Sequence, residues 1–415
     1  MNNHTVTNNN KNMKSDVPRI KVAFLFFSTG KDWHGGKNYF RALFDALDKD
    51  PDCTLHVHAF FGKKINPAEF QFPTSVTCIT SGILDRGSFA WFFDRVFKRL
   101  FGLTPLMKRV LKSHGIKIVS HCDPLDSGGL PNIAWIPDFQ HVHLPHFFKP
   151  KELATRNAQF KSAIKNSQLV VVSSHAALAD LRNFLPTQAN KARVLRFCAI
   201  QPEVKGNGTF DVLQHYSLDN KFFYIPNQFW AHKNHRIAIE ALALLHENWP
   251  DLKIVCSGAL SDYRNPEHID SIRAKISDLD LNEHFVLLGL IPYEHISQLM
   301  VHATAVINPS YFEGWSTTVE EAKALGVPLL LSDIPVHREQ CPNDEALFFH
   351  PDDCDSLISH IKSILKDECP LVNKNNLVAE KALEKHRLNS RKFAQTYVSI
   401  VQEAASYDAN QHIKP

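Results

Sequence analysis

Short apolar runs rich in β-branched residues alternate with segments of helical period along both halves of this 415-residue chain. Unbroken apolar runs of this kind are typical of strands that are buried on both faces of a sheet. Parallel strands need a crossover connection, which the intervening helical segments supply. The alternation therefore predicts an α/β architecture in which helices wrap parallel sheets.

The predicted strands fall into two groups. In the first half they are Ile20–Phe27, Thr54–Phe61, Lys117–Ser120, Asn132–Ile136, Leu169–Ser173 and Arg193–Arg196. In the second half they are Phe222–Ile225, Lys253–Ser257, Phe285–Leu288, Ala305–Asn308, Pro328–Leu331 and Ala346–Phe349. Between the groups lies the polar stretch Gln201–Phe210, whose two glycines are typical of a linker.

The chain is longer than a single hydrophobic core usually supports. We therefore expect two tandem, doubly wound Rossmann-like domains that face each other across a cleft. The expected domains are residues 17–205 and 206–390, preceded by an Asn-rich, disordered segment, 1–16. Residues 391–415 are expected to form a C-terminal helix, and whether it packs back on the first domain is left open.

Composition excludes several classes of protein. Hydrophobic residues make up 44% and charged residues 21%, as in soluble globular proteins. No apolar run is long enough for a transmembrane helix, and the polar start lacks a signal-peptide region. The eight cysteines are scattered, without zinc-site spacing, so they are expected to be reduced thiols. These features predict a cytoplasmic protein.

The charge is unevenly distributed, although the net charge is only +3. Residues 1–206 contain 28 Lys and Arg against 15 Asp and Glu, and the remaining residues contain 18 against 28. A basic half is compatible with nucleic acid, an anionic lipid surface or a phosphate-bearing substrate, and the sign of the charge does not choose among them.

Two carboxylates eight positions apart stand out in the second half. The segment from Asn308 to Pro328 is predicted to form a strand, a loop, a helix and a further strand, with Glu313 in the loop and Glu321 in the first helical turn. Both can then reach one ligand at the helix N-terminus, where free N–H groups and the helix dipole favour an anion. Alternatively, Glu321 belongs to a capping box whose N-cap is Thr318.

This Glu-Gly-aromatic segment, with Glu-Ala eight residues after the first Glu, resembles the retaining family-4 glycosyltransferases of the GT-B fold, in the group-1 class. The resemblance implies that Glu313 approaches the donor sugar and that Glu321 holds the nucleotide ribose. It also implies a donor-binding turn made of Gly314, Trp315, Ser316, Thr317 and Thr318. Many members carry Gly-Leu-Pro where this chain has Ser316 to Thr318.

The resemblance extends to the start of the second domain. Many members carry an Arg and a Lys that clamp the donor diphosphate; Lys233 matches the Lys, but Gln228 occupies the position of the Arg. His232 or His235 is a candidate to replace the missing charge, as is Arg264 after the next strand. The backbone near Ile291 is expected to contact the nucleobase.

The first domain is expected to supply the other lip of the cleft. The family has a Gly-Gly loop against the donor phosphates, which here corresponds to Gly35 and Gly36, before a helix from about Asn38. After a later strand, Asp138 and His141 are predicted to act on the acceptor side. The alternative is that the glycines form a simple tight turn and that the histidine is a core or surface residue.

Residues 88–111 interleave aromatic and aliphatic side chains with Arg and Lys. This pattern is typical of a helix that lies on an anionic membrane surface, but an ordinary helix covering the first sheet fits equally well. Nucleic acid is not expected as a partner, because no recognised binding module accompanies the basic charge.

The resemblance implies transfer of a sugar, from a GDP- or UDP-linked donor, to a glycan or lipid-linked acceptor with retention of configuration. The motifs resemble those of enzymes that build bacterial surface polysaccharides, and mannose is one possible transferred sugar. No cofactor and no metal ion is expected. Two alternatives remain: a GT-B-fold sugar-nucleotide epimerase or phosphorylase, and a non-catalytic sugar-nucleotide-binding protein.

Overall fold

The computed structural model describes residues 19–27, 34–201, 211–219, 221–343, 345–369, 371 and 376–407. Within these residues, one parallel sheet has seven strands in the order β3-β2-β1-β4-β5-β6-β7, and a second has six in the order β10-β9-β8-β11-β12-β13. Both orders are doubly wound: successive strands are added toward one edge up to a switch point, between β1 and β4 in the first sheet and between β8 and β11 in the second, and then toward the other edge. The predicted fold class is therefore confirmed. The predicted disordered segment, 1–16, and most of the predicted linker lie outside the described residues.

The first sheet contains every strand predicted for it, close to the predicted positions. Its strands are β1 (Ile20–Phe26), β2 (Leu55–Phe61), β3 (Thr77–Thr80), β4 (Ile118–Ser120), β5 (Asn132–Ile136), β6 (Leu169–Val172) and β7 (Ala192–Val194). Only β3 was not predicted. It is a short edge strand in which partly buried and exposed residues alternate, so it has no continuous apolar run to reveal it.

The second sheet also matches the prediction. Its strands are β8 (Phe222–Ile225), β9 (Lys253–Cys256), β10 (Phe285–Leu287), β11 (Ala305–Asn308), β12 (Leu329–Ser332) and β13 (Leu347–Phe349). Every residue of β8, β11 and β12 is buried, because hydrophobic clusters lie on both faces of the sheet.

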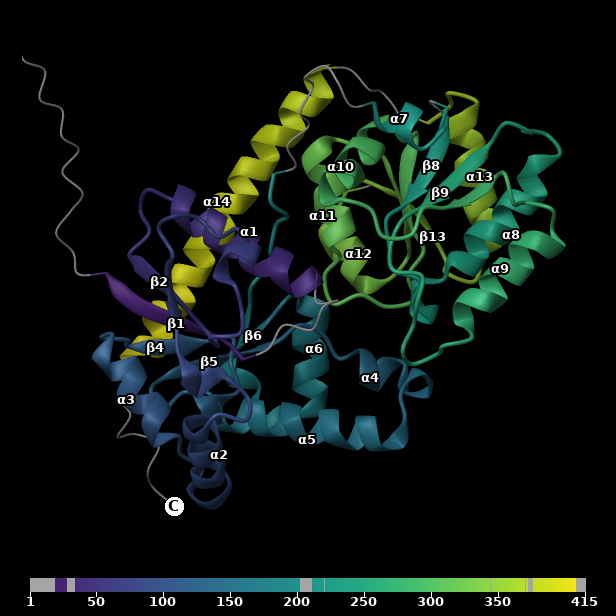
Figure 1. The fold of residues 1–415 in the computed structure, drawn as a ribbon. Coiled ribbons are helices and arrows are strands. Elements are labelled where there is room, and N and C mark those ends of the chain that lie inside the picture. Colours follow the sequence, from purple (N-terminus) through teal and green to yellow (C-terminus); the bar gives the residue numbers. More distant parts are fainter. Residues whose placement is uncertain are drawn as a thin grey trace, which may run out of the picture.

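Helices cover both sheets (Figure 1). In the first half they are α1 (His34–Lys49), α2 (Phe89–Phe101), α3 (Pro105–Ser113), α4 (Gln140–His143), α5 (Pro150–Asn166) and α6 (His175–Phe184). The second half has α7 (Val212–His215), α8 (His235–His246), α9 (His268–Asp278), α10 (Tyr293–His302), α11 (Thr317–Leu325), α12 (Pro335–Gln340), α13 (Cys354–Leu365) and α14 (Asn376–Ser406).

Helix α14 joins the two halves and crosses the predicted boundary at residue 390. It leaves the second half and runs along the first, as the yellow helix in Figure 1 shows, and it contacts both α11 and α1. Its residues Phe393, Ala394 and Tyr397 are part of the core beneath the first sheet. Helix α14 is therefore anchored on the first domain.

Helix α2 has an unusual orientation. Phe89, Phe92 and Leu100 are 83%, 60% and 66% exposed, whereas Asp94 is only 5% exposed. The Asp94 carboxylate accepts the backbone N–H groups of Leu106 and Met107 at 2.9 and 2.8 Å, at the start of α3. The acidic side chain thus faces the protein while large apolar side chains face outward. None of the described helices has the length and apolarity to span a membrane.

Candidate active site

A cleft of about 470 Å³ lies between the two sheets and is lined from both sides. The second half contributes the loops that follow β8 and β11, the adjacent strands at its topological switch point. The lining residues are Gly35, Gly36, Tyr39, Trp135, Pro137, Asp138, Gln140, Ser173, Phe197, Pro226, Asn227, Gln228, Trp230, His232, Lys233, Phe312, Glu313, Gly314, Trp315, Ser316, Thr317 and Thr318. Ligands of doubly wound sheets bind at this position.

The central polar feature of the cleft is an ion pair between Lys233 and Glu313, whose Nζ and Oε1 atoms are 2.6 Å apart. The Ser310 hydroxyl lies 2.8 Å from the same carboxylate oxygen. Burial is the largest single influence and raises the pKa of Glu313, but the charge and hydrogen bond of Lys233, with smaller contributions from nearby histidines, together lower the pKa to about 2. Glu313 is therefore ionised at neutral pH.

The chain turn after β8 brings Lys233 to this carboxylate. Residues Ala231–Lys233 form a single 3₁₀ turn that ends at Asn234, which has the left-handed conformation at φ 54°. Asparagine tolerates this conformation better than most residues, and the Asn234 side chain donates to the carbonyl of Pro351 at 2.8 Å. Helix α8 then starts in a new direction, with Lys233 left at the edge of the cleft.

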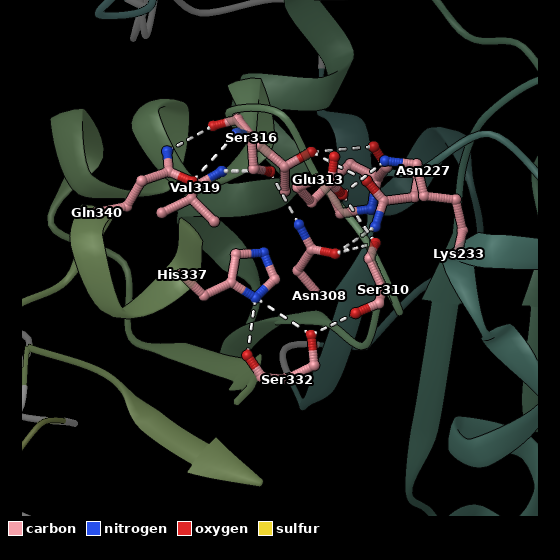
Figure 2. Close-up of polar contacts among 12 residues, drawn as sticks. Asn227, Lys233, Asn308, Ser310, Glu313, Ser316, Val319, Ser332, His337 and Gln340 are labelled. Carbon is pink, nitrogen blue, oxygen red and sulfur yellow. Dashed lines mark hydrogen bonds and ion pairs between the residues drawn. The ribbon is translucent and has the colours of Figure 1, made fainter. Parts of the chain in front are cut away.

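A network of buried amides and hydroxyls supports the loop that carries Glu313 (Figure 2). Asn308 donates to Ser316 Oγ at 2.8 Å and accepts from the Asn227 amide at 3.2 Å. The Thr318 hydroxyl donates to Asn227 Oδ1 at 3.1 Å. Because each group has a partner, the network fixes the turn without leaving a buried polar group unpaired.

The predicted helix cap was wrong. The N-cap of α11 is Ser316, whose Oγ accepts the N–H of Val319, and Thr318 lies within the helix with its hydroxyl on Asn227. Glu321 consequently lies five residues after the N-cap instead of three, beyond the first helical turn. The capping box fails because the helix starts earlier, where Ser316 is held by Asn308.

Glu321 is buried beside α10 rather than lining the cleft of 470 Å³. The Tyr293 hydroxyl donates to its Oε1 at 2.7 Å. Burial raises the pKa of Glu321 to about 7, and the hydrogen bond from Tyr293 only partly opposes this rise. The two carboxylates identified from the sequence therefore have opposite electrostatic character, and the role of Glu321 on a ribose stays a prediction.

The two lips of the cleft touch at Gly314. A Cβ atom at this position would clash with the carbonyl oxygen of Pro137 and would lie 2.8 Å from the Cβ of Asp138. Asp138 lines the cleft, and its carboxylate accepts the N–H of Gln140 at 2.9 Å, which shapes the facing turn. Only glycine permits this close approach of the two halves.

His141 does not reach the cleft, contrary to the prediction. Its ring is 2% exposed, packs edge-on against Phe160, and lies 3.2 Å from the Asn157 carbonyl oxygen. Helix α4 begins at Gln140 and turns the histidine into the core beneath α5, while Asp138 stays at the surface of the cleft. Contact between His141 and an acceptor is therefore not supported by its position.

The candidates for the missing positive charge also lie differently than predicted. Burial lowers the pKa values of both His232 and His235 to about 3, so neither ring is charged at neutral pH. Arg264 lies outside the cleft lining; its guanidinium stacks on Phe148 at 4.1 Å and donates to Gln140 at 2.9 Å. It thus links the two halves instead of facing the cleft.

Of the remaining predicted residues, some line the cleft and others do not. Gly35 and Gly36 line the cleft from the first turn of α1, which begins at His34 and not near Asn38. Gln228 also lines it, whereas Ile291 packs against the core of the second half.

Several residues of the site were not predicted. Tyr39, Trp135 and Trp230 add aromatic surface to the cleft. Trp135 lies near the end of a predicted strand, Trp230 follows one, and Tyr39 follows the two glycines closely in the chain, which was the available signal. His337 and Gln340 support the site from α12, as Figure 2 shows. No motif marked them, because they are brought to the loop only by the fold.

The second half is similar in sequence to known proteins. Residues 211–385 match the family model of glycosyl transferases group 1. The O-antigen chain mannosyltransferase RfbU of Salmonella typhimurium is 30% identical over 169 residues, which cover 41% of this chain and 45% of that protein. The O-antigen chain mannosyltransferase B of Escherichia coli is 29% identical over 26% of this chain and 28% of its own length. The matches therefore span less than half of either relative.

Solved structures show the fold over nearly the whole chain. Anabaena Alr3699/HepE, in complex with UDP and glucose, superposes with a TM-score of 0.68 at 17% identity, covering 92% of this chain and all of that one. Sucrose-phosphate synthase from Thermosynechococcus elongatus superposes with a TM-score of 0.62 at 19% identity, covering 93% of this chain and 96% of that one. The two-domain arrangement is that of GT-B glycosyltransferases.

Proposed function

We propose that this chain, whose residues 211–385 match the glycosyl transferases group 1, is a glycosyltransferase of surface-polysaccharide synthesis. It would move a sugar from a GDP- or UDP-linked donor to a glycan or lipid-linked acceptor, with retention of configuration. The observation that carries the proposal is the Lys233–Glu313 pair, which lies in the interdomain cleft and within the matched half. The similarity to two O-antigen mannosyltransferases supports mannose as the transferred sugar.

The cleft can neutralise a nucleoside diphosphate in two ways. Lys233 provides a partly buried cation, and the first turn of α11 presents backbone N–H groups at the positive end of the helix dipole. Because Gln228, His232 and His235 are uncharged, we expect the helix end to supply a larger share of this neutralisation than in relatives with an additional arginine. Catalysis would then be mainly electrostatic and positional.

The roles of the carboxylates follow from their environment. Glu313 stays ionised and is held by Lys233 and Ser310, so it can orient sugar hydroxyls or stabilise positive charge that develops at the anomeric carbon. Asp138 lines the facing lip, and we propose that it orients the acceptor hydroxyl. Closure of the lips at Gly314 would exclude water from the reaction.

The direct test is to incubate the purified protein with GDP-mannose or UDP-sugars and lipid-linked acceptors, and to determine the anomeric configuration of the product by NMR. We expect a retained configuration, and a loss of roughly 100-fold or more in kcat for Glu313→Gln, as for removal of a preorganised electrostatic group. An inverted product would refute the retaining mechanism.

The same assay separates the alternatives. A sugar-nucleotide epimerase would convert the donor without an acceptor, and a phosphorylase would require inorganic phosphate. A non-catalytic binding protein would bind GDP or UDP, detected as a rise in melting temperature, yet give no product from any donor.

We also propose that the enzyme acts in the cytoplasm at the inner face of the membrane, held there by residues 88–111. The prediction of one amphipathic segment was wrong in detail, because Gly102 breaks it into α2 and α3. The same two helices also carry the exposed basic residues Arg99, Lys108 and Arg109. Lys98 is already neutralised by Asp123 and Asp126, so apolar insertion would contribute more than charge.

A further inference from the structure

The side chain of Gln340, at the end of α12, holds the turn formed by residues 314–318, here called the donor-side turn. Its Oε1 accepts the N–H of Ser316 at 3.0 Å, and its Nε2 donates to the Ser316 carbonyl and to Glu320, each at 3.0 Å (Figure 2). Gln340 is only 2% exposed. One amide therefore pairs with both backbone groups of Ser316, where the turn enters α11, and fixes its orientation.

The preceding residue, Glu339, faces the other half of the molecule. Its carboxylate accepts the backbone N–H of His175 at 2.9 Å and that of Ala176 at 3.3 Å, at the start of α6. It also accepts from Arg196 Nε at 2.7 Å. A carboxylate at a helix N-terminus is favoured by the helix dipole, so this contact docks α12 on the first domain.

In the donor-side turn, as in α12, one residue contacts the first domain and its neighbour contacts the other element. Trp315, next to Ser316, donates from its indole Nε1 to the carbonyl of Phe197 at 2.8 Å, and the Arg196 guanidinium lies 6.0 Å from the ring. Thus Trp315 and Glu339 contact the first domain, while their neighbours Ser316 and Gln340 contact each other. A cavity of about 450 Å³ beyond Trp315 leaves space in which these contacts can rearrange.

We propose that α12 couples docking of the first domain to the shape of the donor-side turn, with Glu339 and Gln340 as positioning residues. When Glu339 engages α6, Gln340 is held where it orients Ser316 and the first turn of α11. When the domains separate, α12 loses its anchor and the turn loosens. The inference rests on the proposed function, in which residues 316–318 bind the donor.

Hydrogen–deuterium exchange of the full chain tests the coupling without requiring activity. Glu339→Gln preserves the shape of the side chain but removes its charge from the start of α6. We expect faster exchange at residues 175–178 and also, by about fivefold or more, at residues 316–319, which Glu339 does not touch. The donor KM should rise by a similar factor. The matched control is Glu240→Gln, which removes an ion-paired carboxylate within the second domain and should leave both regions unchanged.

The double variant makes the test specific. If Gln340 transmits the effect, Gln340→Ala should loosen residues 316–319, and adding Glu339→Gln should have little further effect there. Faster exchange at α6 alone in Glu339→Gln, with an unchanged donor KM, would overturn the inference. Should Gln340→Ala fail to fold, the Glu339→Gln result decides alone. Absence of any glycosyl transfer by the wild type would refute the proposed function, whereas the exchange coupling would still be measurable.

Discussion

At the scale of single residues, burial and neighbouring charge give two glutamates of one motif opposite properties. Glu313 has Lys233 as a partner, so its pKa falls to about 2 in spite of burial. Glu321 accepts a hydrogen bond from the Tyr293 hydroxyl and has no cationic partner among the described residues, so burial dominates and its pKa rises to about 7. At neutral pH Glu313 carries a full charge, whereas Glu321 holds a proton for part of the time.

The raised pKa of Glu321 predicts a pH-dependent stability. Between its ordinary value of 4.5 and the folded value of about 7, the folded protein keeps a proton that the unfolded chain loses. Stability therefore falls as the pH rises through this window. Glu321→Gln removes this loss. We therefore expect the unfolding free energy of the variant, relative to that of the wild type, to be higher at about pH 8 than at about pH 4, by on the order of 3 kcal/mol.

Thermal unfolding of wild type and Glu321→Gln at the two pH values checks this expectation. Glu240→Gln is the matched control. The pKa of Glu240 is lowered because Lys275 and Arg236 outweigh its partial burial, so this variant should lose stability at the higher pH. A difference between wild type and Glu321→Gln that is the same at both pH values would contradict the prediction.

At the scale of elements, helix α2 shows how a local tertiary contact orients an amphipathic segment. Asp94 is needed at the start of α3, where it accepts two backbone N–H groups. This contact fixes the rotation of α2 about its axis and leaves Phe89, Phe92 and Leu100 exposed. An outward row of large apolar side chains is uncommon unless another surface covers it.

Sedimentation with vesicles tests the proposed membrane contact. We expect binding to vesicles that contain phosphatidylglycerol, and a loss of roughly tenfold or more when Phe92→Ser and Leu100→Ser are combined, because each buried apolar side chain contributes about 1.5–3 kcal/mol. The matched control combines Leu244→Ser and Leu388→Ser, two similarly exposed leucines elsewhere. If the α2 variant instead abolishes self-association of a protein that does not bind vesicles, the surface contacts a second copy.

At the scale of the whole molecule, the site exists only because two domains meet. Gly314 of one half lies against Pro137 and Asp138 of the other, Arg264 bridges to Gln140, and α14 runs between the halves. The shape of the cleft therefore depends on contacts between the halves, and we expect it to open and close around a ligand while each sheet stays intact.

Gly314→Ala is expected to hold the lips apart. The atoms nearest to the new methyl group would be those of Pro137 and Asp138 in the first domain, so we expect the cost to fall on closure rather than on folding. We expect a larger radius of gyration by small-angle X-ray scattering, a reduced kcat and a nearly unchanged melting temperature. Gly82→Ala, where the new atom would have only ordinary contacts, is the control. Unchanged scattering together with unchanged kcat would show that the contact does not govern closure.

The sequence alone determined the layered architecture and the loops that form the site. Buried parallel strands must be continuous apolar runs, so β8, β11 and β12 could be predicted from local composition. The loop with Glu313 and the turn with Lys233 followed, since strand ends at one edge of a sheet converge. The edge strand β3 escaped prediction because half of it is exposed.

Only the tertiary structure decided which polar groups face the cleft and what charge they carry. His141 is rotated into the core by α4, Arg264 is held between the halves, and burial neutralises His232 and His235. Gln340 and Glu339 acquire their positions from contacts with residues distant in the chain. Hydrophobic periodicity depends on residues adjacent in the chain, so it could be predicted from the sequence. The burial and pairing of a polar side chain depend on distant residues, so they could not.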